Sequence, residues 1–83
     1  MLTEVALDRL LKYHYSLWKT LQELRSSPDP EDLLEQWRRA PRPTQAWRQA
    51  RFYETALDVL AVSLSLPREE TEELVRQHVF WSR

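Results

Sequence analysis

Apolar residues recur along residues 44–65 at alternating steps of three and four, the spacing that places side chains on one face of an α-helix. The members of this seam are Ala46, Ala50, Tyr53, Leu57, Leu60 and Leu64. A second apolar stripe along the same helix is made of Phe52, Val59, Val62 and Leu66. Because a surface helix needs only one apolar face, we expect this helix, about 33 Å long at 1.5 Å per residue, to be covered on two sides.

Three further segments show helical periodicity. The spacing of their apolar residues predicts a second long helix over residues 3–25 and short helices over residues 30–39 and 67–81. Connections this short favour antiparallel packing of neighbouring helices. The sequence therefore predicts an all-α fold, a compact bundle of two long and two short helices around the helix at 44–65.

Residues that start and stop helices support these boundaries. Pro28 ends the first helix, because proline cannot continue one. Asp29 is the expected N-cap of the next helix, and Pro30 occupies its first position. The Pro-Arg-Pro segment at 41–43 forms a stiff linker, and Thr44 is the expected N-cap of the helix after it.

Composition narrows the possible functions. The chain of 83 residues has the length of one domain, so we expect residues 1–83 to form a single helical unit. It has no cysteine, which excludes disulfides, thiolate metal sites and a cysteine nucleophile. It also has no glycine, which excludes the glycine-dependent phosphate and dinucleotide loops. The net charge of −1 provides no overall field that attracts nucleic acid or an anionic membrane.

The sequence shows no sign of membrane insertion or export. No run reaches 18 apolar residues, and the N-terminus has acidic residues within its apolar pattern rather than a basic leader. We therefore expect a cytoplasmic protein with no membrane partner.

A basic segment lies where the helices at 30–39 and 44–65 meet. Its arginines, which we call the Arg corner, are Arg38, Arg39, Arg42, Arg48 and Arg51. Trp37 and Trp47 lie among them, and no acid occurs between Glu35 and Glu54. Arginine binds phosphate through two N–H groups and tryptophan stacks on bases, so nucleic-acid or phosphate binding is an alternative function. Helix-end charge, an Arg51–Glu54 pair and burial of both tryptophans account for the same residues structurally.

Two histidines and two pairs of carboxylates are the remaining candidates for chemistry. His14 and His78 each interrupt an apolar seam and have no carboxylate four residues away, so we interpret them as structural and predict no metal site and no cofactor. The carboxylate pairs are Asp32 with Glu35 and Glu54 with Asp58. This arrangement resembles the paired magnesium ligands of all-α nucleotide pyrophosphatases, and the resemblance implies a metal-dependent nucleotide hydrolase as a third hypothesis.

The excess of apolar surface gives the main functional hypothesis. Helix 44–65 is apolar on two sides, and the chain carries further aromatic residues near both ends. Large apolar patches mark surfaces that bind partners. We therefore expect a small non-enzymatic protein–protein interaction module, either self-associating or part of a larger complex. The candidate contact residues are Phe52, Val59, Val62, Phe80 and Trp81. The acidic start of helix 67–81 in one copy could face the Arg corner of another.

Overall fold

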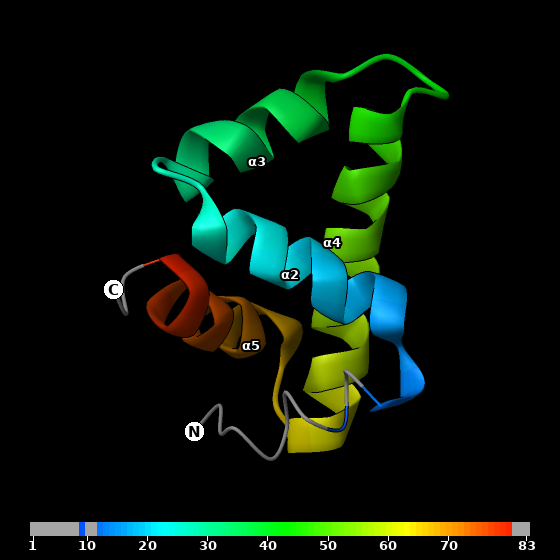
Figure 1. Ribbon diagram of the computed structural model, residues 1–83. Coiled ribbons are helices and arrows are strands. Elements are labelled where there is room, and N and C mark those ends of the chain that lie inside the picture. Colours follow the sequence, from blue (N-terminus) through cyan, green and yellow to red (C-terminus); the bar gives the residue numbers. More distant parts are fainter. Residues whose placement is uncertain (1–8, 10–11, 81–83) are drawn as a thin grey trace.

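The computed structural model describes Arg9 and residues 12–80, excepting the side chains of Val79 and Phe80 (Figure 1). These residues form α2 (Tyr15–Ser26), α3 (Pro30–Arg39), α4 (Gln45–Leu64), α5 (Arg68–Val75) and a π-helical turn, η1 (Arg76–Phe80). Within this part of the chain there is no β-strand. The predicted all-α class is confirmed.

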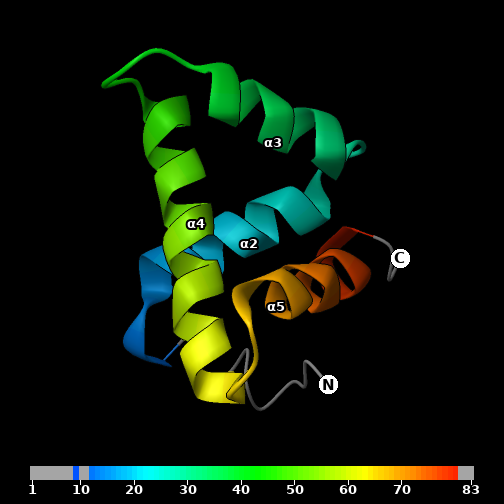
Figure 2. The ribbon, with the colours of Figure 1, turned by 180° about the vertical axis from the view of Figure 1, so that it is seen from behind.

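The helices α2, α3 and α5 all contact α4, and α2 also contacts α3 and η1. In Figure 1 and in the reverse view of Figure 2, α3 and α5 extend from the same side of α4. The start of α2 emerges on the opposite side of α4 in both views. Thus α4 contacts each of the other three helices, and α3 and α5 leave one of its sides uncovered.

Local sequence explains where α3 and α4 begin. The Asp29 side chain accepts a hydrogen bond of 3.1 Å from the backbone N–H of Asp32, and Pro30 follows at the first helical position. The Thr44 hydroxyl accepts a bond of 3.3 Å from the N–H of Trp47. Both N-caps predicted from the sequence are confirmed.

The end of α4 requires an unusual backbone conformation. Ser65 has φ 55° and ψ 43°, in the left-handed region that glycine favours, and this chain has no glycine to place there. The N–H of Ser65 donates to the carbonyl of Val62, and the N–H of Leu66 donates to that of Ala61. These bonds satisfy the last carbonyls of α4 and turn the chain into α5.

The predicted helix over residues 3–25 is wrong as one continuous element. His14 has φ −141° and ψ 64°, so its backbone is not helical, and its carbonyl accepts from the N–H groups of Leu17 and Trp18 as α2 begins. His14 itself is exposed rather than partly buried. The predicted residues 3–8, 10 and 11 lie outside the described part.

The core is built from the seams that the spacing identifies. Buried apolar side chains come from α2, α3, α4 and α5, and they are Leu17, Leu21, Leu24, Leu34, Trp37, Ala50, Tyr53, Ala56, Leu57, Leu60 and Val75. Two buried threonines, Thr20 and Thr71, lie among them. Most of the first apolar seam of α4 therefore faces the other helices, as predicted.

Candidate interaction surface

Five of the exposed residues of α4 lie on one continuous face. Steps of three and four residues connect its members, which are Arg48, Arg51, Thr55, Asp58 and Val62. We call this the outer face of α4. Val62, near its C-terminal end, is 82% exposed. A valine so exposed on a helix that is otherwise well packed is the clearest departure from burial in the described structure.

The predicted contact residues fall into two groups. Phe52 and Val59 are partly buried and pack against the core, at one margin of the outer face. Val62 is exposed on that face. Trp81 and the side chain of Phe80 lie outside the described residues. The second stripe of α4 is therefore half-buried at Phe52, Val59 and Leu66 and 82% exposed at Val62, so the covering of this stripe does not extend to Val62.

A hollow of about 250 Å³ borders the outer face on the side of α2. It is lined by Tyr15, Ser16, Lys19, Thr20, Gln45, Gln49 and Phe52. Tyr15 is 59% exposed, and its ring stacks on Trp18 at 5.8 Å between centroids. Sequence spacing did not select Tyr15, because it lies outside the apolar seam of the predicted helix.

A second hollow of about 260 Å³ borders the other margin, between α3 and α4. Its lining residues are Arg38, Trp47, Ala50, Arg51, Glu54, Thr55 and Asp58. The outer face of α4 is thus a ridge between two hollows. Ridges of this kind can interdigitate with the grooves of another helix.

The Arg corner does not form a single cluster. The guanidinium carbons of Arg42 and Arg51 lie 5.1 Å and 5.4 Å from the centroid of the Trp47 ring. Arg48, in the first turn of α4, is exposed. The remaining two arginines point to carboxylates: Arg39 pairs with Glu35 at 3.1 Å, and Arg38 extends to other helices.

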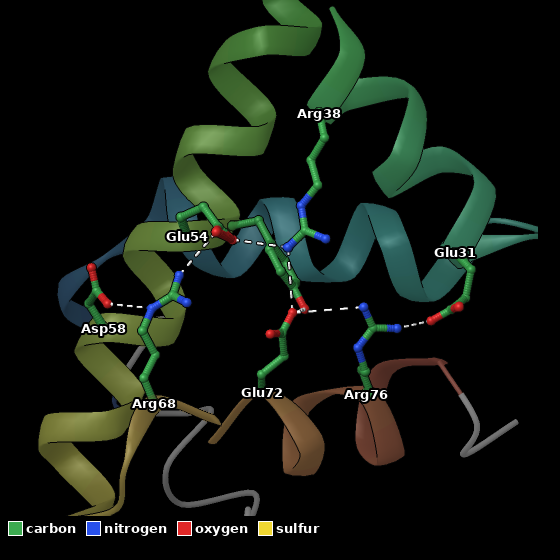
Figure 3. Close-up of polar contacts among 8 residues, drawn as sticks. Glu31, Arg38, Glu54, Asp58, Arg68, Glu72 and Arg76 are labelled. Carbon is green, nitrogen blue, oxygen red and sulfur yellow. Dashed lines mark hydrogen bonds and ion pairs between the residues drawn. The ribbon is translucent and has the colours of Figure 1, made fainter. Parts of the chain in front are cut away.

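Arg38 belongs to a continuous row of ion pairs across α3, α4, α5 and η1 (Figure 3). In order, its members are Asp58, Arg68, Glu54, Arg38, Glu72, Arg76 and Glu31. Arg68 lies 2.8 Å from Asp58 and 3.1 Å from Glu54. Arg38 lies 3.2 Å from Glu54 and 3.5 Å from Glu72. The row joins segments that are far apart in the sequence, and it was not predicted.

The carboxylates of this row stabilise the charged forms of two of its arginines. Burial alone would lower the pKa of Arg38, but the hydrogen bond to Glu54 and the charge of Glu72 raise it overall. The hydrogen bond to Asp58 raises the pKa of Arg68. The buried Tyr53 contacts the middle of the row, with its hydroxyl 3.3 Å from Oε2 of Glu72. Burial first, and then the Glu72 charge, raise the pKa of Tyr53.

The carboxylate pairs behind the hydrolase hypothesis do not converge. Glu54 and Asp58 face arginines in the ion-pair row. Asp32 accepts a hydrogen bond of 2.7 Å from Gln36, and Glu35 pairs with Arg39. Over Arg9 and residues 12–80, no three His, Cys, Asp or Glu side chains are placed to hold a metal ion. A hard cation requires several converging oxygens, so this geometry does not favour the hydrolase hypothesis.

Comparisons with known proteins identify no relative. No protein-family model matches the chain, and searches of curated proteins and of solved structures also find no match. None of the helices in the described part is long and apolar enough to cross a lipid bilayer.

Proposed function

We propose that this protein is a small non-enzymatic interaction module that binds a protein partner along the outer face of α4. The observation that supports this most is Val62, which is 82% exposed on the same stripe as the half-buried Phe52 and Val59. In this proposal α4 organises the fold: α2, α3 and α5 cover its first seam, and a partner covers the second.

The energetics of burial favour such a contact. Complete burial of a valine side chain stabilises a complex by about 1.5–3 kcal/mol. The exposed parts of Phe52 and Val59 would add to this, and Tyr15 borders the same surface across the hollow. Amphipathic helices with anchors at such spacings commonly bind in the groove of a partner.

A matched pair of variants tests the proposal. Val62 on α4 and Gln77 on η1 are both exposed, so glutamate at either position should leave the helix content unchanged. The tagged chain, purified from its native host with nuclease present, should bring down a stoichiometric protein. We expect Val62→Glu to lose that protein while Gln77→Glu retains it. If both variants retain the protein, the outer face of α4 is not the binding surface.

One observation favours a second function, nucleic-acid or phosphate binding. Arg42 and Arg51 lie over the Trp47 ring, which orders two guanidinium groups that phosphate could bind. In this case binding of single-stranded nucleic acid should weaken steeply with added salt and be lost in the Arg42→Gln/Arg48→Gln double variant. Salt-independent or absent binding rejects this function.

A further inference from the structure

We propose that the protein partner on the outer face of α4 is a second copy of this chain, packed so that the two α4 helices run antiparallel. This inference rests on the proposed function and names the partner of the same surface. It follows from two features of α4, the spacing of its side chains and the charge at its two ends.

The spacing is that of a helix–helix seam. Successive steps of four, three, four and three residues connect Arg48, Phe52, Thr55, Val59 and Val62. Thr55 is at the middle of this seam and is the small, exposed residue at which two helices can approach closely. A two-fold axis near Thr55 places Phe52 of one copy beside Val59 of the other. The same axis brings Arg48 near Val62, whose exposed methyl groups the aliphatic part of the arginine can cover.

The start of α4 and the start of α5 carry opposite charge. Arg48 and Arg51 are exposed near the start of α4. Glu69 and Glu70 are exposed in the first turn of α5, which follows the end of α4. The bond of 2.8 Å between Arg68 and Asp58 holds the start of α5 beside the outer face. In the part of the chain that the structure describes, Arg48, Glu69 and Glu70 form no ion pair.

Charge complementarity selects the antiparallel arrangement. An antiparallel pair places the basic end of each copy against the acidic end of the other, so the favourable contact occurs twice. A parallel pair would place like charges together. Two-fold symmetry with such a self-complementary surface is the commonest form of soluble oligomer.

The same charges favour a second copy over nucleic acid. The net charge of the chain is −1, and the acidic start of α5 lies at one end of the face that contains Arg48 and Arg51. Phosphates following this face would meet those carboxylates. In an antiparallel pair, the second copy instead places Glu69 and Glu70 opposite the arginines of the first.

Two charge-reversal variants and their mixture test this inference. The first is Arg48→Glu/Arg51→Glu, which makes both ends of the face acidic. The second is Glu69→Lys/Glu70→Lys, which makes both ends basic. We expect light scattering to give twice the chain mass for the wild type and the single chain mass for each variant alone. An equimolar mixture of the two variants should recover the twofold mass, because each then meets the opposite charge.

Controls separate this result from unfolding. Circular dichroism should show the wild-type helix content for both variants, and Arg39→Glu, a charge change on α3, should leave the twofold mass unchanged. A wild-type chain that stays monomeric from micromolar to millimolar concentration overturns the inference. If that monomer still captures another protein through Val62, the proposed function stands and only the identity of the partner is wrong. Dimers that persist in both variants, or nuclease-sensitive nucleic acid lost with Arg48→Glu/Arg51→Glu, also overturn it.

Discussion

At the scale of single residues, Tyr53 shows how one side chain serves two environments. Its ring is completely buried in the seam of α4, and the guanidinium carbon of Arg38 lies 5.6 Å from the ring centroid. Its hydroxyl donates to Glu72 on α5. The ring contributes to the core, while the hydroxyl connects the core to the ion-pair row.

Tyr53→Phe should lower the free energy of unfolding by about 1–2 kcal/mol at neutral pH, because it removes a hydrogen bond to a charged group. Burial and the Glu72 charge raise the pKa of Tyr53 in the fold, so the folded state holds its proton more tightly than the unfolded chain does. Stability from this group is complete below the unfolded pKa of about 10 and is lost as pH rises above it. In that range the wild type should lose about 1.4 kcal/mol per pH unit more than the variant. Denaturant titrations at pH 7 and pH 11 measure the difference.

Tyr15→Phe is the control, because Tyr15 is 59% exposed whereas Tyr53 is completely buried. We expect its alkaline stability profile to match that of the wild type. Equal profiles for Tyr53→Phe and the wild type would contradict the assignment of a protonated, hydrogen-bonded Tyr53.

At the scale of helices, contacts between residues close in the sequence were predictable, and contacts between distant residues were not. The bounds of α3 follow from Asp29 and Pro30, whose effects act within one turn. The break at His14 was not predicted, because His14 falls within an apolar seam whose helical spacing continues past it. The partner of Arg38 on α5 is Glu72, which is 34 residues away in the sequence, so only the folded arrangement brings them together.

The candidate surface was predictable to a similar extent. The stripe containing Val62 is visible in the sequence because helical spacing is regular, and its exposure was part of the hypothesis. The degree of burial of Phe52 and Val59 was not visible, because it depends on how closely α2 approaches α4. The Arg corner does not form one cluster, because its arginines contact different partners. Arg38 and Arg39 are adjacent in sequence but point to carboxylates on different helices.

Two neighbouring arginines of α3 allow the ion-pair row to be tested. The Arg38 side chain is 37% exposed and contacts two other helices, whereas Arg39 is 78% exposed and pairs only along α3 with Glu35. Arg38→Ala should lower the free energy of unfolding by about 1–2 kcal/mol, since it removes contacts with two carboxylates and with the Tyr53 ring. Arg39→Ala should change it by less than about 0.5 kcal/mol. Chemical denaturation at low salt gives both values, and equal effects would show that the row does not link the helices energetically.

At the scale of the whole molecule, size limits the stability that the chain can provide by itself. A chain of 83 residues buries only about 60% of its unfolded surface, so its own core gives modest stability. Burial of the exposed Val62 and of the half-buried Phe52 and Val59 by a partner would add to that stability. Association through that face would link folding to protein concentration.

This linkage gives a prediction that needs no knowledge of the host. If two copies bind through α4, dilution favours the unfolded chain, and the midpoint of thermal unfolding should rise with protein concentration in the wild type. Val62→Lys places a cation beside Arg48 of the other copy and should abolish that rise, whereas Gln77→Lys, at an exposed position on η1, should retain it. Calorimetry of the three chains over a hundredfold range of concentration measures the effect. A wild-type midpoint independent of concentration would mean that the stability of the fold does not depend on a second copy, and the exposed Val62 would then have to be explained by a different protein.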